Sequence, residues 1–378
     1  MNAMTTYTRT VFSLGFLSIT SFTALAQSPE LGMRTTQQSQ VTSVKNQGGT
    51  GTCWCYSTTA MVESECLRKN LGEFDISEMY TVRNIYLEKA RNYVRRQGKA
   101  QFDEGGLGHD VLNAIALYGA VPESVYSGLK EGETNHNHGK LVKDLKAYLS
   151  DVTKKLPIDP NWEEGYTKIL DEKFGKVPAS FDYNGKTYTP REFADQVLKF
   201  NPNDYVSLTS FTHHPFYTSF VLEIPDNWAN ERYLNVPLDE LNAAVKQSLS
   251  QGYTIMWDAD VSNPGFKQGK GFAVEVNGKN DKADSPEVTE RTVDQTYRQK
   301  LFDSQVTVDD HLMQIAGMGT NAAGKKFYLV KNSWGEKAGP YKGYIYVSEP
   351  YFDLNTINVI LPKAALPESI KSKVNLSE

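Results

Sequence analysis

The segment from residue 52 to residue 70 constrains the fold of this 378-residue chain more than any other. It contains neither glycine nor proline, is rich in small side chains, and is followed by Gly72, a residue type that commonly ends helices. These features predict a buried central helix. A chain of this length buries a large core without covalent cross-links, and its three cysteines are too few for a disulfide scaffold.

The first 26 residues have the pattern of a cleavable secretory signal. Arg9 is the only charged residue among them, a short apolar run follows at 11–19, and Ala24-Leu25-Ala26 provides a small-residue cleavage site. The apolar run contains serine and glycine and is shorter than the roughly 20 apolar residues of a membrane-spanning helix. We therefore expect cleavage after Ala26 and a secreted or periplasmic protein, with no membrane association of the mature chain.

The rest of the chain divides into a helical front and a β-rich back, which predicts an α+β protein with two packed halves. Helix signals begin at Ser77, His109, Thr189 and Leu238. Strand signals occupy 254–257, 272–276, 313–317, 327–330, 344–347 and 357–360. We expect an N-terminal extension (27–40) and one domain over 41–378, made of a helical lobe (about 41–129), a helical insertion (about 130–250), a β-rich lobe (about 251–363) and a tail (364–378).

The charge pattern excludes some partners. The net charge is −5 and no block of basic residues occurs, which argues against a nucleic-acid partner. Four cations of the second helix are expected on a solvated face: Lys89, Arg91, Arg95 and Arg96. Four histidines lie in predicted polar loops without the carboxylate or cysteine spacing of a metal site, so we expect no metal and no cofactor: His136, His138, His213 and His214.

The residues that indicate chemistry begin with Cys53, which follows three glycines and opens the predicted central helix. Unpaired N–H groups at a helix start, together with a nearby imidazolium, favour a thiolate. His311 stands at the mouth of a predicted strand and Asn332 follows another, so the chain offers a thiol, a base and an amide that orients the base. Cys55 and Cys66 lie about 16 Å apart on one helix, beyond disulfide reach, and are predicted to pack in the core.

These motifs resemble those of the papain-like cysteine peptidases: Gln47 with Cys53 six residues later, then His311, then Asn332-Ser333-Trp334-Gly335. The resemblance implies a two-lobed fold with a helical lobe and a β-barrel-like lobe. It implies that Cys53 is the nucleophile, that His311 is the general base, and that Asn332 holds the imidazole.

The same resemblance assigns three supporting roles. Trp334 would shield the bond between the histidine and the asparagine, and Gln47 would donate its side-chain amide to the oxyanion. Gly105 and Gly106 are similar to the glycine pair with which these enzymes bind the substrate backbone. Peptides or proteins are therefore the expected substrates.

Within that superfamily the chain is more similar to the bleomycin hydrolase and aminopeptidase C branch, because Cys53 and His311 are 258 positions apart, against roughly 130–150 in papain and the cathepsins. The branch implies removal of residues from a free amino terminus, which its members enforce with a carboxyl-terminal tail inside the cleft. Residues 364–378 show no clear match to that tail. Endopeptidase action and a catalytically silent peptide-binding protein therefore stay open, as does a homo-oligomer.

Overall fold

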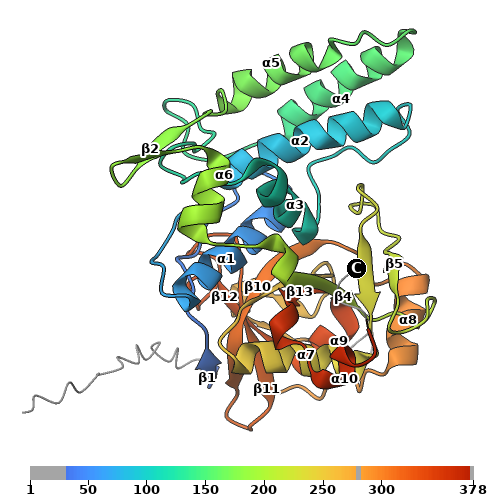
Figure 1. The fold of residues 1–378 in the computed structure, drawn as a ribbon. Coiled ribbons are helices and arrows are strands. Elements are labelled where there is room, and N and C mark those ends of the chain that lie inside the picture. The colour runs from blue at the N-terminus through green and yellow to red at the C-terminus, as the bar shows by residue number, and fades with distance from the viewer. Residues whose placement is uncertain (1–30, 278–281, 375–378) are drawn as a thin grey trace, which may run out of the picture.

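The structure is a computed structural model that describes residues 31–277 and 282–374. The predicted signal segment at 1–26 lies outside the described residues. A helical lobe lies on one side and a lobe built on a large sheet lies on the other (Figure 1). Among the helices of the described ranges, none has both the length and the apolar character needed to cross a membrane.

The central helix of the helical lobe is α1 (Cys53–Arg68), and its first fourteen residues are all buried. Small side chains allow α2 (Glu78–Arg95) and α3 (Gly108–Tyr118) to pack closely against it. The Ser77 hydroxyl caps α2 by accepting a hydrogen bond of 3.0 Å from the Tyr80 N–H. The three helices predicted for this lobe are therefore confirmed.

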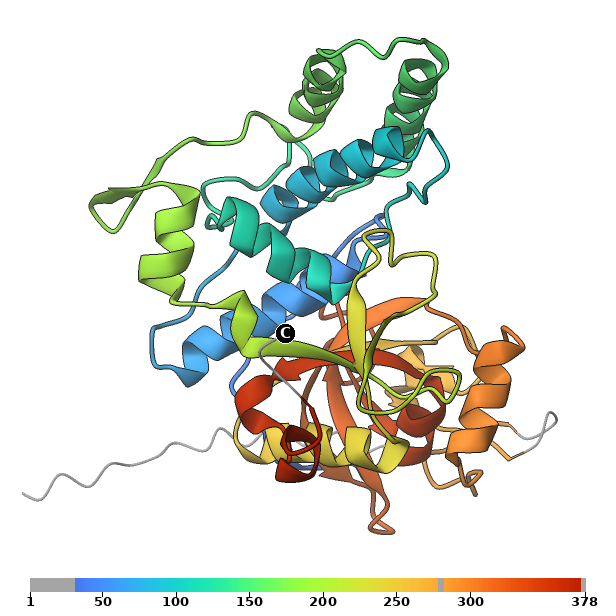
Figure 2. The same ribbon diagram turned by 45° about the vertical axis from the view of Figure 1, so that its right-hand side comes forward.

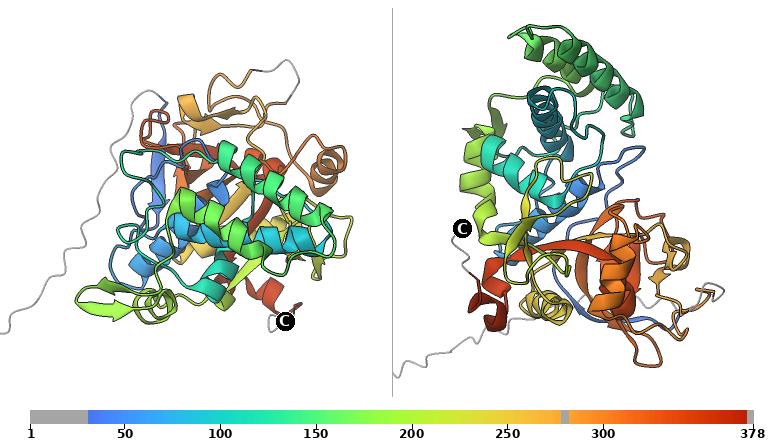
Figure 3. Two further views of the ribbon diagram at one scale, coloured as in Figure 1. Left: turned by 90° about the horizontal axis from the view of Figure 1, so that it is seen from above. Right: turned by 90° about the vertical axis from the view of Figure 1, so that its right-hand side faces the viewer.

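The insertion carries the expected helices. Helices α4 (Gly139–Lys154) and α5 (Trp162–Phe174) pack on the side of α2 that faces away from the sheet (Figures 2 and 3). A small hairpin follows, made of β2 (Phe181–Tyr183) and β3 (Lys186–Tyr188). The predicted capping box at Thr189 is present, but the helix that it starts, α6 (Pro190–Glu192), continues as a π-helical turn at Phe193–Leu198.

The insertion also contains strands that the sequence did not reveal. These are β4 (Tyr205–Thr209), β5 (Ser219–Val221) and β6 (Arg232–Asn235), and they extend the main sheet at one edge. They are followed by α7 (Leu238–Ser250), which was expected. The insertion is thus divided between the two lobes, because its first part packs on α2 and its last part pairs with the sheet.

The sheet runs in the order β5-β6-β4-β13-β7-β10-β11-β12-β9-β8, with β1 paired to β10. Its remaining strands are β1 (Arg34–Gln38), β7 (Ile255–Ala259), β8 (Phe266–Lys267), β9 (Phe272–Ala273), β10 (His311–Thr320), β11 (Lys326–Lys331), β12 (Tyr344–Ser348) and β13 (Thr356–Pro362). Neighbours are antiparallel except for the pairs β4–β6 and β9–β12. Because β5 and β8 form open edges within the described ranges, the barrel-like lobe is an unclosed sheet.

Alternating residues of the central strands face the two sides of the sheet. Met256, Leu312 and Ile360 join the core around α1, whereas Trp257 and Met313 join the core around α7. The second core also includes residues of α9 (Glu349–Asn355) and α10 (Glu368–Lys371), whereas Phe302 of α8 (Gln295–Asp303) packs against the core around α1. The described part of the tail therefore lies across the sheet from α1.

Candidate active site

Cys53 lies where the two lobes meet. It is the first residue of α1, and its Sγ contacts the backbone N–H of Leu312 in β10. His311 precedes that residue at the start of β10. The thiol is buried, with 8% of Cys53 exposed. The fold thus brings the predicted nucleophile and the predicted base together from positions far apart in the sequence.

The imidazole of His311 is held from one side and covered from another. Its Nε2 lies 2.8 Å from the Asn332 Oδ1, and the Trp334 ring lies 4.8 Å from the imidazole ring, centroid to centroid. The Asn332 amide is oriented in turn, because its Nδ2 donates to the Gln268 Oε1 at 3.1 Å. Since Nε2 is engaged by Asn332, Nδ1 is the imidazole nitrogen left for the thiol.

Gln47 is fixed beside Asn332. Its Nε2 donates to the Thr50 carbonyl at 2.6 Å, and its Oε1 accepts a hydrogen bond of 2.6 Å from the Ser333 hydroxyl. A primary amide carries two N–H groups, so one remains available to a reacting carbonyl oxygen. The loop before α1 therefore holds Gln47 in the position expected for an oxyanion donor.

Burial opposes charge on both members of the thiol–imidazole pair. It raises the pKa of Cys53 to about 12, and the carboxylates of Asp309, Asp258 and Asp226 raise it further. It also lowers the pKa of His311 to about 4, although the bond to Asn332 acts in the opposite direction. Burial therefore favours the neutral thiol and the neutral imidazole, and it opposes the effect of the helix start, which favours the thiolate.

The Gly105–Gly106 pair is covered by a segment of the insertion. A Cβ built on Gly105 would collide with the carboxylate of Asp226, which lies between β5 and β6. The Lys89 ammonium also holds this segment, because it donates hydrogen bonds to the carbonyls of Asp103 and Gly105. Only 1% of Lys89 is exposed, so the expected solvated face was wrong for this residue: its aliphatic stem is buried and its charge is satisfied by backbone carbonyls.

Two further acidic residues lie within electrostatic reach of Cys53. Asp258 belongs to β7 and stands opposite Leu312 of β10, on the face of the sheet that is turned toward α1. Asp309 precedes β10 by two residues and is half-buried. Sequence reasoning missed Asp226, Asp258 and Asp309; an acid inside an otherwise apolar strand, as in 255–259, was the one local signal available.

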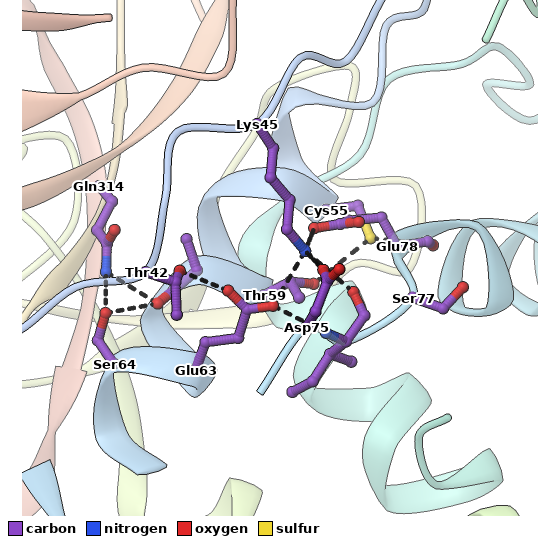
Figure 4. Close-up of polar contacts among 12 residues, drawn as sticks. Thr42, Lys45, Cys55, Thr59, Glu63, Ser64, Asp75, Ser77, Glu78 and Gln314 are labelled. Atoms are coloured by element: carbon purple, nitrogen blue, oxygen red, sulfur yellow. Dashed lines mark hydrogen bonds and ion pairs between the residues drawn. The ribbon is translucent and has the colours of Figure 1, made fainter. Parts of the chain in front are cut away.

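A cluster of ionised side chains, in which Glu63 and Glu78 are buried and Asp75 is exposed, lies beside the loop that leads to Gln47 (Figure 4). The Lys45 ammonium lies 3.0 Å from Glu63, 2.7 Å from Asp75 and 2.8 Å from Glu78. Burial alone would lower the pKa of Lys45, but the carboxylates of Glu78, Glu63 and Asp75 raise it well above its usual value. We call these four residues the Lys45 cluster. It anchors the loop that leads to Gln47 onto α1 and α2.

The remaining histidines take no part in this site. His136 and His138 are buried, contrary to expectation, because α4 and α5 close over their loop; His138 Nδ1 lies 3.1 Å from the Tyr86 hydroxyl. His213 and His214 both contact Glu223, at 3.1 and 2.8 Å, and the three side chains have the composition of a metal site. Gln299 donates to His213 Nδ1, so hydrogen bonds already account for the orientation of that ring.

Comparison with known proteins links the chain to characterised peptidases. The profile of the Peptidase C1-like family matches residues 179–377, just over half of the chain, and that of the papain family cysteine proteases matches residues 28–140. Aminopeptidase C of Streptococcus thermophilus is 25% identical over 364 residues, which cover 85% of this chain and 80% of that protein. Aminopeptidase E of Lactobacillus helveticus is 25% identical over 373 residues, covering 87% and 82%.

A solved structure shares the fold. The chain matches PepW from Lactobacillus rhamnosis with a TM-score of 0.72 over 90% of this chain and 84% of that one, at 21% sequence identity. At this identity the likeness speaks for the fold alone, whereas the family profiles cover both lobes. The chain therefore belongs to the Peptidase C1-like family of papain-type cysteine peptidases.

Proposed function

We propose that the protein is a cysteine aminopeptidase that removes residues from the free amino terminus of peptides. The observation that carries this proposal is the position of Asp226 over Gly105. An extended substrate chain on the amino-terminal side of the scissile bond would have to run along the Gly105–Gly106 backbone, where the insertion already lies. The names of the relatives, Aminopeptidase C and Aminopeptidase E, support the same function.

The proposed chemistry passes through an acyl-enzyme on Cys53. The thiol proton moves to Nδ1 of His311 as sulfur attacks the scissile carbonyl carbon, and the carbonyl oxygen accepts hydrogen bonds from the Gln47 Nε2 and the Cys53 N–H. The imidazolium then protonates the leaving amine. Water, deprotonated by the same imidazole, hydrolyses the thioester and restores the thiol.

The neutral resting pair fits a mechanism in which proton transfer accompanies attack. Separated charges are costly in a buried site, as the shifted pKa values of Cys53 and His311 indicate. The bond from His311 to Asn332 stabilises the imidazolium as it forms. We propose that Trp334, stacked on the imidazole, keeps water from this bond.

The tail does not supply the restriction to free amino termini in its described part. Residues up to 374 pack against α7: the Gln247 amide donates to the Leu366 carbonyl at 3.3 Å, and Ile370 is fully buried there. This surface lies on the face of the sheet opposite α1. We therefore assign the restriction to the insertion segment that carries Asp226.

Paired fluorogenic substrates test the proposal. Leucyl-aminomethylcoumarin and its N-acetylated form are compared under reducing conditions for the wild type and for Cys53→Ala. We expect preferential cleavage of the free-amine substrate and loss of at least about 10³-fold in kcat for the variant, because the nucleophile is removed. Equal activity of the variant would overturn the mechanism, and faster cleavage of the acetylated substrate would favour an endopeptidase.

We also propose that the protein is exported and that its amino-terminal 26 residues are removed. The measurement is the intact mass of the protein recovered outside the cytoplasm. A mature chain that begins at Gln27 is expected, and a chain that retains Met1 in that compartment would contradict the proposal.

A further inference from the structure

Three carboxylates from distant parts of the chain converge beside Cys53. Asp226 comes from the insertion, Asp258 from β7, and Asp309 from the segment before β10; we call them the acidic cluster. Asp258 and Asp309 are in hydrogen-bonding contact with one another, and Asp226 lies within electrostatic reach of both. Each of the three also acts on the Cys53 thiol. The cluster therefore lies within electrostatic reach of the nucleophile.

Asp258 is the most deeply buried member of this cluster. Its side chain is fully buried, and its Oδ2 accepts a hydrogen bond of 2.5 Å from the Asn358 amide. Its Oδ1 has no donor partner among the described residues. The group facing it is the carboxyl of Asp309, which is an acceptor when ionised. Burial and the charge of Asp309 raise the pKa of Asp258 well above its usual value, so Asp258 keeps a proton that it donates to Asp309. The negative charge of the cluster therefore rests on Asp309 and Asp226, and a ligand that brings N–H donors would satisfy it.

No cation of the described chain neutralises the cluster. No lysine, arginine or histidine in residues 31–277 and 282–374 forms an ion pair with Asp226, Asp258 or Asp309. Lys89 is near Asp226, but its ammonium is directed at two backbone carbonyls. Other acidic groups act on the cluster: Asp103 and Asp110 raise the pKa of Asp226, and Asp310 raises the pKa of Asp258 and of Asp309.

We infer that the acidic cluster is the subsite for the protonated α-amino group of the substrate's first residue. The inference rests on the proposed aminopeptidase function and names the side chains that read the free amino terminus. Asp226 and Asp309, both half-buried, contact the ammonium, whose three N–H groups match the acceptors on offer. Asp258 positions Asp309 through the hydrogen bond between their carboxyl groups. A cation placed here also offsets the mutual repulsion of the three carboxylates.

Kinetics of charge-neutralising variants test the inference. Asp226→Asn and Asp309→Asn are each expected to lower kcat/KM for leucyl-aminomethylcoumarin roughly 10- to 100-fold, mainly through KM, because a partner of a desolvated charge is lost. The preference for leucyl-aminomethylcoumarin over its N-acetylated form, measured as the ratio of the two kcat/KM values, should fall at least about tenfold in each variant. Asp310→Asn is the matched control, because that carboxylate is exposed and accepts from the Val261 N–H.

The outcomes separate this inference from the proposed function. A wild-type enzyme that prefers free amines, with variants that keep the preference, would overturn the inference alone. A wild type without that preference would overturn the function. A third outcome would also overturn the inference. The variants could lose only the cleavage of N-acetylated peptides that carry arginine before the cleaved residue, which would show that the cluster binds a basic side chain.

A binding measurement removes the dependence on turnover. In the Cys53→Ala background, calorimetric titration with leucine amide is expected to give an affinity at least about tenfold higher than with N-acetyl-leucine amide. Adding Asp226→Asn should abolish the difference. Equal binding of the two amides to Cys53→Ala would overturn the inference.

Discussion

Two groups of three carboxylates flank α1, and they differ in one respect. In the Lys45 cluster, Glu63, Asp75 and Glu78 surround an ammonium supplied by the chain (Figure 4). In the acidic cluster, the corresponding centre has no cation from the described residues. The first group is complete in the free protein, whereas the second becomes complete when a ligand binds.

The difference separates structural charge from binding charge. Glu63 also accepts hydrogen bonds from the Thr42 hydroxyl, at 2.6 Å, and from the Ile76 N–H, at 2.9 Å, so every part of that cluster ties one segment to another. The acidic cluster instead keeps Asp226 and Asp309 within electrostatic reach of the Cys53 thiol, and neither forms an ion pair with a cation of the described residues. Unfavourable electrostatics of this kind persist at sites where a ligand relieves them.

Removing the Lys45 ammonium should leave the carboxylates of the Lys45 cluster without a cation, as in the acidic cluster. Lys45→Met is expected to lower the free energy of unfolding by about 3–5 kcal/mol, because it leaves buried carboxylates without a counter-ion. Denaturant titration at pH 7 measures this loss. Lys69→Met is the control, since its partly exposed pair with Glu65, at 3.3 Å, should contribute less than about 1 kcal/mol. A loss below about 1 kcal/mol for Lys45→Met would show that the cluster is not structural.

Neutralising one acid of the acidic cluster should raise the free energy of unfolding, whereas removing the Lys45 ammonium lowers it. Asp309→Asn is expected to raise the free energy of unfolding by about 1 kcal/mol at pH 8, while Glu63→Gln lowers it. The gain is modest because Asp309 is half-buried and partly screened by solvent. Destabilisation by Asp309→Asn at pH 8 would place this residue with the structural charges.

The stability gained by Asp309→Asn should depend on pH in a direction that follows from the pKa of Asp309. Burial, followed by the charge of Asp226, raises the pKa of Asp309 to about 7, above its unfolded value near 4, although the hydrogen bond with Asp258 acts in the opposite direction. Between those values the folded protein binds a proton that the unfolded chain has lost, so stability falls as the pH rises from about 4 to 7. The advantage of Asp309→Asn should therefore shrink toward zero as the pH is lowered to 4. An advantage that stays constant would assign it to another cause.

The sequence predicted those features whose signals are local. The Ser77 cap, the Thr189 capping box and the strands around 313–317 and 327–330 all lie where their patterns indicated. The motif residues Cys53, His311 and Asn332 were found because each sits at the end of a recognisable element. The glycine stop at 72 likewise matches the end of α1 at Arg68.

What the sequence did not predict depends on contacts between distant segments. The local sequence does not distinguish Lys89 from its exposed neighbours, because its burial depends on the Gly105 carbonyl to which its ammonium donates. Asp226 is 121 positions from Gly105 in the sequence, and no local pattern joins them. The short strands β4 to β6 are set by pairing with β13 and with one another rather than by their own composition.

The burial of Cys53 bears on how readily its thiol is oxidised between turnovers. Peroxides and disulfides react with thiolates far faster than with thiols, and here burial keeps the resting sulfur protonated. The nucleophile becomes reactive only when a carbonyl group and its oxyanion donors are in place. The interface between the lobes, which buries Cys53, thus protects the thiol chemically between turnovers.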